Sequence, residues 1–291
     1  MSYRKHNRLV TILVLLVLAV FTWSFELDKV TAGKPVCPEQ LLCVVFLDVG
    51  QGDAIFIQSP TGVQMLIDGG RSSAVLRQLA SVMGFFDKDL DYVLSTHPDA
   101  DHVGGLVDVL ERYQVENIIR TENESDTLVW STFENDVESE GATVYMARRG
   151  QRYSLGSGVV LDILFPDVNP SQLESNQSSI VARLSYGETS VLLTGDAPKG
   201  IEEYLVLVEG EHLASDVLKV GHHGSRTSTS ELFINEVQPS YAIISAGKDN
   251  QYGHPHVEVT DLLFNSGVVT YSTVEKGNII LVSDGKTISE P

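Results

Sequence analysis

After residue 41 the chain is a succession of short apolar runs rich in β-branched residues, separated by turns and by longer stretches that suit helices. Apolar runs of this length, bounded by Gly, Pro and Asp, are typical of buried strands. The pattern predicts an opening meander of three strands, followed by two blocks that each mix strands with flanking helices. We therefore expect an α/β fold, built as a layered α/β/β/α sandwich.

The expected elements cover most of residues 41–291. The predicted strands lie at residues 42–47, 54–58, 63–67, 92–95, 115–120, 143–146, 159–165, 180–186, 190–194, 216–220, 241–245, 268–271 and 278–282. The predicted helices lie at residues 72–83, 101–113, about 130–139, 199–208, 228–236 and 257–265. In folds of this kind, function is expected at the strand ends and in the loops that follow them.

The strongest functional signal is the segment STHPDADHVGG (95–105), which follows a predicted strand and precedes a predicted helix. It places His97, Asp99, Asp101 and His102 within six positions. Acids that converge in this way are costly unless a cation neutralises them. Capping of the helix would account for one aspartate, but not for a second aspartate and two histidines. The segment predicts a metal site.

Three further polar clusters follow predicted strands. Asp196 ends one apolar run, where it could bridge metal ions or cap a helix. His222 and His223 lie between glycines after another run, and His254 begins the last cluster. Six of the eight histidines fall in these loops and in the 95–105 segment, so the imidazoles are concentrated where a metal site is expected.

The N-terminal residues suit a targeting segment. Residues 1–8 carry basic residues and no acid, and the 17 residues of 9–25 are uncharged and apolar. We expect residues 1–32 to be a signal peptide or a signal anchor, residues 33–40 a linker, and residues 41–291 the catalytic domain. The domain would then lie outside the cytoplasm, either secreted or held at the membrane.

Cys37 and Cys43 are the two cysteines of the chain. Export would permit a disulfide between them, and two unpaired, buried cysteines are an equally good interpretation. No CxxC motif is present, which excludes a cysteine zinc site.

The formal charge is 20 − 39 = −19. This acidic balance disfavours a protein that grips nucleic acid through a broad basic face. It leaves open a catalyst that meets phosphate through metal ions.

The loops together resemble the metallo-β-lactamase superfamily, and within it the C-terminal hydrolase domain of the DNA-uptake protein family ComEC. The matching stretches are FLDVGQGDA (46–54), LIDGG (66–70), STHPDADHVGGL (95–106), NQSS (176–179), LLTGDA (192–197), LKVGHHGS (218–225) and NQYGHPH (250–256). The resemblance implies a metallo-β-lactamase-like four-layer αββα sandwich, with one or two divalent ions at the edge of the sheets that activate water.

Carried over by position, the resemblance assigns a ligand set. His97, Asp99, Asp101 and His102 would be ligands, Asp196 would bridge two ions, and His222 is favoured over His223 as the late ligand. A further histidine ligand of many family members is missing, because residues 103–195 contain none, and Asn176 lies roughly in its place. Oxygen ligands in place of imidazoles favour Mn²⁺, while zinc remains open.

Other residues are candidates for supporting roles. Asp101 could also accept a proton, His254 could protonate the leaving group or bind a phosphate oxygen, and Lys219 and Ser225 could contact substrate. Asp68 is expected to order the segment 95–105, called the metal loop below. For Lys219, Ser225 and His254, a purely local role in a strand end, a helix cap or a loop remains open, and Asn176 could equally be a turn residue.

The sequence thus favours an exported, metal-dependent hydrolase. Its expected reaction is phosphodiester cleavage by a nuclease that acts on DNA and is linked to DNA uptake in competence. Two alternatives stay open: hydrolysis of another ester, such as a cell-envelope or phosphocholine phosphodiester, and a non-catalytic accessory of DNA uptake. The expected partners are DNA or another phosphodiester, the DNA-uptake machinery, and a membrane if the N-terminal segment is retained.

Overall fold

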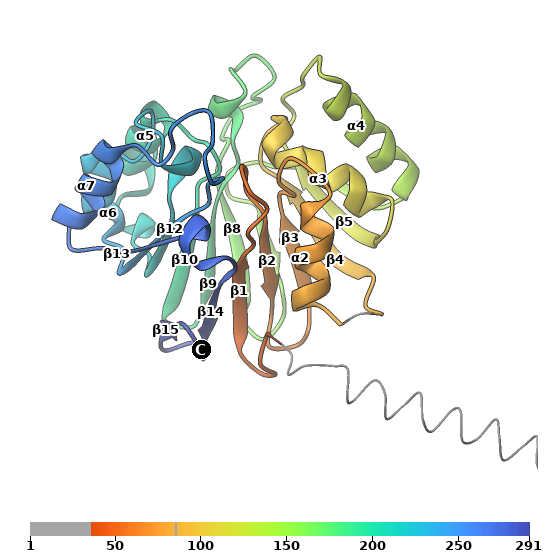
Figure 1. The fold of residues 1–291 in the computed structure, drawn as a ribbon, viewed down its shortest axis with the longest axis horizontal. Coiled ribbons are helices and arrows are strands. Elements are labelled where there is room, and N and C mark those ends of the chain that lie inside the picture. Colours follow the sequence, from red (N-terminus) through yellow and green to blue (C-terminus); the bar gives the residue numbers. More distant parts are fainter. Residues whose placement is uncertain (1–35, 85) are drawn as a thin grey trace, which may run out of the picture.

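The computed structural model describes residues 36–84 and 86–291, which form two β-sheets packed face to face between two layers of helices (Figure 1). The first sheet has the order β15-β14-β1-β2-β3-β4-β5-β6. Its strands are β1 (Leu42–Phe46), β2 (Ile55–Gln58), β3 (Gln64–Ile67), β4 (Asp89–Ser95), β5 (Gln114–Arg120), β6 (Thr143–Met146), β14 (Ile279–Ser283) and β15 (Ile288–Ser289).

The second sheet has the order β13-β12-β11-β10-β9-β8-β7. Its strands are β7 (Arg152–Ser154), β8 (Val159–Phe165), β9 (Val181–Tyr186), β10 (Thr189–Leu193), β11 (Val217–Lys219), β12 (Tyr241–Ile244) and β13 (Val269–Ser272).

Helices cover the outer face of each sheet. The first sheet is covered by α2 (Ala74–Val82), α3 (Ala100–Leu110) and α4 (Leu128–Glu140), and the second by α5 (Lys199–Glu209), α6 (Glu231–Val237) and α7 (Val257–Asn265). Shorter helical segments are α8 (Thr273–Lys276), η1 (Asn176–Ser178), η2 (Gly210–Leu213) and η3 (Gly221–Gly224).

The composition of β1 shows why the chain adopts these layers. All five of its residues are buried. Val44 and Phe46 point into the core between the two sheets, whereas Cys43 and Val45 point into the core beneath the helices. A strand with both faces covered reads as a continuous apolar run, so the α/β/β/α sandwich predicted from the sequence is confirmed.

Strand direction brings the functional loops to one edge of the molecule. In the first sheet β3, β4, β5 and β6 are parallel, and in the second β10, β11, β12 and β13 are parallel. The carboxyl ends of parallel strands meet at the same edge of a sheet. The loops after β3, β4, β10, β11 and β12 therefore gather there.

The predicted elements agree with the structure within a few residues at each end. The opening meander is also confirmed, since β1 pairs with β2 and β2 with β3 in antiparallel register. The strands β7 and β15 and the helix α8 were missed, because each is only two to four residues long and has no apolar run.

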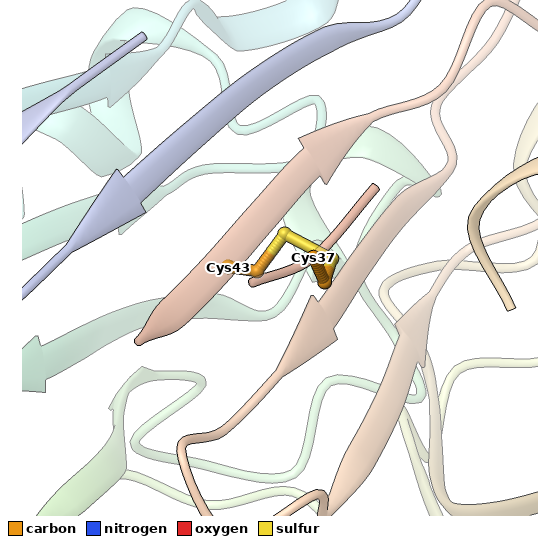
Figure 2. The surroundings of a disulfide bond; sticks show 2 residues. All are labelled: Cys37 and Cys43. Atoms are coloured by element: carbon orange, nitrogen blue, oxygen red, sulfur yellow. A yellow bond between two sulfur atoms is a disulfide. The ribbon is translucent and has the colours of Figure 1, made fainter. Parts of the chain in front are cut away.

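Cys37 and Cys43 form a disulfide, which fixes the segment before β1 to that strand (Figure 2). Of the two interpretations of these cysteines, the disulfide is therefore the correct one. Cys37 is buried in the core beneath the helices, so the end of the predicted linker is packed against the domain.

The predicted targeting segment, residues 1–32, lies outside the described residues. Within residues 36–84 and 86–291, no helix has the length and apolarity needed to cross a membrane.

Candidate metal centre

Asp196 lies at the middle of the candidate centre, just after β10, and its side chain is buried. His102 Nε2 is 3.4 Å from Asp196 Oδ1. Asp196 Oδ2 is 3.9 Å from His97 Nε2, 3.7 Å from His222 Nε2 and 3.5 Å from His223 Nε2. The loops after β4, β10 and β11 thus bring four imidazoles to one carboxylate.

The two aspartates of the 95–105 segment lie at opposite ends of this group. His97 Nε2 is 3.6 Å from Asp99 Oδ2, and His223 Nε2 is 3.5 Å from Asp101 Oδ2. Asp99 occupies the N-cap position of α3, yet its side chain makes no capping hydrogen bond and instead accepts one from Ser175 Oγ at 2.6 Å. Capping therefore does not account for Asp99.

Several of these atoms are buried without a partner. Within the described residues, His97 Nε2, His102 Nε2, His223 Nε2 and Asp196 Oδ1 have no hydrogen bond. A buried polar atom without a partner costs about 1–3 kcal/mol, so four around one point require an explanation. A divalent cation would satisfy all four, because neutral imidazole nitrogens and carboxylate oxygens are its usual ligands.

The same conclusion follows from the spacing of possible ligands. One ligand atom each from Asp53, His102, Asp196 and His223 lie within 4.8 Å of one another, and all four residues are buried. The donor set therefore fits a metal ion.

The other ring nitrogen of each histidine is held by a neighbour. His97 Nδ1 lies 3.0 Å from Thr96 Oγ1, His102 Nδ1 2.7 Å from Asp68 Oδ2, His222 Nδ1 3.1 Å from Thr227 Oγ1, and His223 Nδ1 3.1 Å from the Ser245 carbonyl oxygen. A proton on Nδ1 suits each of these acceptors. In a neutral imidazole, as a metal ligand must be, that tautomer leaves the Nε2 lone pair directed at Asp196 and its neighbours.

Asp68 connects the end of β3 to the metal loop. It is fully buried and accepts hydrogen bonds from Thr96 N at 2.8 Å and Thr96 Oγ1 at 2.7 Å, in addition to its contact with His102. Asp68 has a positive φ of 57°, a conformation that aspartate adopts more readily than most residues. The geometry is that of a residue that orders the metal loop.

Asp53 and Lys219 form a buried ion pair beneath the centre, with Lys219 Nζ 2.7 Å from Asp53 Oδ2. Asp53 Oδ1 lies 3.3 Å from His223 Nδ1. Burial alone would raise the pKa of Asp53, but Lys219 and His223 lower it to about 2. Lys219 is fully buried and faces Asp53, so it does not reach the solvent side of the centre as a substrate contact would require.

The sequence leaves Asp53 open between ordering the metal loop and simply shaping its turn, and does not predict it as a ligand. In the structure Asp53 contacts Lys219 and His223 beneath the centre. The GQGDA turn before β2 packs closely on the metal loop. A Cβ at Gly52 would lie 2.0 Å from the carbonyl oxygen of Asp101, so glycine is required there. Only the fold shows that this turn and β11 meet beneath the centre.

The buried carboxylates and imidazoles of the centre shift one another's pKa values strongly. Burial opposes the ionised form of Asp196, yet His223 and His102 hold its pKa well below the usual range. Burial likewise opposes the imidazolium forms, yet Asp196 raises the pKa of His223 to about 9 and that of His102 well above 6.5. The pKa of Asp101 is also lowered, because His223 and His102 outweigh the effect of burial. The carboxylates of the centre thus stabilise positive charge on the groups beside them, as they would on a bound cation.

His222 and His223 are consecutive, and both adopt a left-handed backbone, with φ of 48° and 55°. Their rings stand at 75° to each other, with centroids 6.0 Å apart, and both reach Asp196. His223 is buried and lies on the Asp101 side, whereas His222 is partly exposed. The structure therefore brings both histidines to the centre.

Asn176, Ser225 and His254 lie around His222. Asn176 Nδ2 is 3.5 Å from His222 Nδ1. Ser225 Oγ accepts hydrogen bonds from the backbone and hydroxyl of Thr227, so it braces the His222 loop. The His254 ring lies 5.5 Å from that of His222, and burial together with His222 and His223 lowers the pKa of His254 to about 4. His254 is therefore neutral at pH 7.

Comparison with known proteins places these features in a family. A sequence profile of the metallo-beta-lactamase superfamily matches residues 47–248. The chain is 30% identical over 297 residues to "ComE operon protein 3" of Bacillus subtilis, covering 92% of this chain and 38% of the relative. It is 30% identical over 231 residues to "Competence protein ComA" of Neisseria gonorrhoeae, covering 79% of this chain and 31% of the relative. The chain thus spans about a third of the length of these relatives.

A solved structure shares the fold. The structure of CmlA, a diiron beta-hydroxylase from Streptomyces venezuelae, superposes with a TM-score of 0.54 at 15% identity, covering 84% of this chain and 54% of that chain. At this identity the likeness concerns the fold alone. The profile match, the sandwich of two sheets and the metal-ligand cluster agree, and the chain belongs to the metallo-beta-lactamase superfamily.

Proposed function

We propose that this chain is a metal-dependent phosphodiesterase that cleaves DNA outside the cytoplasm, with water activated by one or two divalent ions. The convergence of four imidazole Nε2 atoms on Asp196, with Asp99 and Asp101 beside them, carries the hydrolase part of the proposal. The relative called a competence protein, together with the resemblance to hydrolase domains of DNA-uptake proteins, supports DNA as the substrate. The apolar segment 9–25 supports export, either with membrane attachment or with secretion.

The geometry supports two ligand groups that share Asp196. We assign His97 and Asp99 to one group because they face each other, and we add His222 because His223 lies on the Asp101 side. We assign Asp101, His102 and His223 to the other, because His223 faces Asp101. In this assignment His222 takes the place of the missing histidine, with Asn176 beside it.

The ligand chemistry favours Mn²⁺. Three carboxylates contribute to the centre, and oxygen ligands suit Mn²⁺ better than a histidine-rich set does. Zinc remains compatible with the four imidazoles.

Divalent ions bound here would lower the pKa of water and offset negative charge on phosphate oxygens. The residues of the chain would supply the rest. Asp101 stays ionised at neutral pH, so it can hold an attacking water by accepting its hydrogen. His254 is neutral and exposed enough to meet the substrate, so it can hydrogen-bond a phosphate oxygen or the leaving group. Lys219 would act indirectly, by holding Asp53 under His223.

A cleavage assay with the full chain tests the proposal. The purified protein with Mn²⁺ should cut single-stranded or double-stranded DNA, and Asp196→Ala should abolish cutting. Asp162→Asn is the matched control, because Asp162 pairs with Arg152 on β7 away from the centre and its loss should leave cleavage unchanged.

Other outcomes would contradict the proposal. Hydrolysis of small phosphodiesters or carboxylic esters, without cleavage of DNA, would favour a different ester substrate. Stoichiometric DNA binding without turnover under Mn²⁺, Zn²⁺ and Mg²⁺ would favour a non-catalytic accessory of DNA uptake.

A further inference from the structure

An aromatic row runs from the candidate centre to the surface of the loop after β12. The His254 ring lies 5.5 Å from His222, and the Tyr252 ring stacks on His254 with centroids 5.6 Å apart and an interplanar angle of 23°. Tyr252 is 47% exposed, and the proposed chemistry does not use it. A flat, exposed ring at this position can receive another ring.

The loop holds Tyr252 in place. Asn250 Nδ2 donates to the carbonyl oxygens of Gly247 and His254 at 2.9 and 2.6 Å, and Asn250 Oδ1 accepts from Tyr252 N and His254 N at 3.2 and 3.0 Å. One amide side chain thus ties both ends of the turn that carries the tyrosine. A pre-organised ring loses little conformational entropy when a ligand stacks on it.

Tyr252 borders a cavity of about 420 Å³ that Gln51, Arg71, Asn250 and Gln251 also line. This volume lies within the range of about 300–1,000 Å³ that is common for ligand sites. The cavity adjoins the metal loop, because Gly104 of that loop packs directly on the carbonyl of Arg71. The cavity therefore lies beside the proposed reaction centre.

Arg71 is exposed, and no acid of the described chain forms an ion pair with it. Some arginines elsewhere are neutralised, as Arg149 is by Glu209 and Arg152 by Asp162. In a chain of net charge −19, an unneutralised guanidinium beside a metal centre suits an anionic ligand. Guanidinium binds phosphate with paired hydrogen bonds.

We propose that Tyr252 and Arg71 form a subsite for one unpaired nucleotide next to the scissile phosphate. The base stacks on Tyr252, and a neighbouring phosphate binds Arg71. In a duplex the faces of each base are covered by its neighbours, so a paired base reaches Tyr252 only after unstacking. The substrate is accordingly a single-stranded nucleic acid, and this inference rests on the proposed phosphodiesterase activity.

The test is a series of single-stranded oligonucleotides in which one abasic residue is moved along the strand. With the full-length protein and Mn²⁺, the abasic residue should lower kcat/KM by about 5- to 10-fold at one position relative to the cut, the lower end of what stacking on an aromatic side chain contributes. Tyr252→Ala should lose about the same factor on the intact strand, mainly through KM. It should no longer respond to the abasic residue.

Matched variants separate stacking from other effects. Tyr252→Phe keeps the ring and should behave as the wild type, and Tyr145→Ala on β6 removes a partly exposed tyrosine elsewhere and should have no effect. Arg71→Gln should raise KM about equally for intact and abasic strands, and should lower the slope of log affinity against log salt by about one.

The outcomes distinguish this inference from the proposed function. If the wild type cuts DNA but Tyr252→Ala slows intact and abasic strands equally, Tyr252 only supports His254, and the nucleotide subsite is wrong while the nuclease stands. If the wild type cuts double-stranded and single-stranded DNA at equal rates, and Tyr252→Ala does so too, the nucleotide subsite is likewise wrong while the nuclease stands. A wild type that cuts no nucleic acid overturns both proposals.

Discussion

Asp68 shows how one buried carboxylate can set the direction of an imidazole on a neighbouring loop. It binds His102 Nδ1 and both polar groups of Thr96, and so directs His102 Nε2 at Asp196. Asp68→Asn would place an amide N–H group against one of these donors. We expect the affinity for Mn²⁺ to fall by about 10- to 100-fold. The measurement is a titration of the metal-free protein with Mn²⁺, monitored by electron paramagnetic resonance.

Asp91→Asn is the control for this prediction. Asp91 accepts a hydrogen bond from Gln64 N at the opposite end of β3, so its replacement should leave the Mn²⁺ affinity unchanged. Equal losses in both variants would mean that Asp68 acts through general stability.

The buried ion pair between Lys219 and Asp53 should contribute strongly to stability. Lys219→Met leaves the buried Asp53 carboxylate without its cation and should lower the free energy of unfolding by about 3–5 kcal/mol. Asp53→Asn combined with Lys219→Met should recover part of this loss, because the uncompensated charge is gone. Urea unfolding of the metal-free proteins measures both effects.

Lys276→Met provides the comparison, because Lys276 pairs with Glu290 on the surface. Exposed pairs contribute about 0–1 kcal/mol. A loss of that size in Lys219→Met would show that His223 alone balances Asp53.

For the individual residues of the centre, the sequence predicted the important loops better than the contacts among them. It predicted that His97, Asp99, Asp101 and His102 converge, because they share one strand-to-helix loop. In the structure the ring centroids of His97 and His102 lie 4.1 Å apart, and the two aspartates lie at opposite ends of the group. It did not predict the Asp53–Lys219 pair, because residues 53 and 219 are distant in the chain and belong to different sheets. It favoured His222 over His223 as the late ligand. In the structure both histidines approach Asp196, and His223 is the one whose ligand atom lies within 4.8 Å of those of His102 and Asp196.

Glu202 connects the helices α5 and α6. It lies in the first turn of α5 and accepts hydrogen bonds from Thr229 N at 2.6 Å and Ser230 N at 2.8 Å, just before α6 begins. Burial raises the pKa of Glu202 from 4.5 to about 7, although these two N–H groups favour the anion. The contact therefore anchors the start of α6 with a carboxyl group that titrates near neutral pH.

This anchor predicts a pH dependence of stability. A pKa that is raised on folding gives a contribution that is fully present below pH 4.5 and is lost as the pH rises through about 7. The difference corresponds to about 3 kcal/mol. Relative to wild type, Glu202→Gln should therefore become more stable by about that amount between pH 4.5 and pH 8, in urea unfolding of the metal-free protein. Parallel pH profiles for the two proteins would contradict it.

The elements themselves were largely predictable because most strands are buried on both faces. Such strands appear in the sequence as uninterrupted apolar runs, as β1 and β10 do. The strand β7 has the sequence RYS and is mostly exposed, so no burial pattern marks it. Its position depends on pairing with β8, which is a tertiary effect.

At the scale of the whole molecule, the net charge of −19 repels DNA. We expect metal ions to supply most of the attraction, so removal of the metal with a chelator should weaken binding of a cleavage-resistant, phosphorothioate-substituted oligonucleotide by at least about 10-fold. Fluorescence anisotropy with Mn²⁺ and with excess chelator measures this. Unchanged binding after chelation would mean that side chains of the protein, and not metal ions, supply the attraction for the oligonucleotide.

Metal should also stabilise the fold, since the ligands come from loops of both sheets. At a free Mn²⁺ concentration of about 100 times Kd, each site should add about 2.7 kcal/mol to the free energy of unfolding. The layered architecture could be predicted from the sequence, whereas the order of strands within each sheet could not. That order depends on pairings between distant segments, such as β1 with β14.

The disulfide between Cys37 and Cys43 has a consequence for orientation. Through their pairing with β2, the strands β1 and β3 run in the same direction, so the metal-ligating loops lie beyond the end of β1 and the disulfide lies at its start. Five residues of strand span about 16 Å. A molecule held through the segment before Cys37 would therefore carry the candidate metal centre on the side away from the point of attachment.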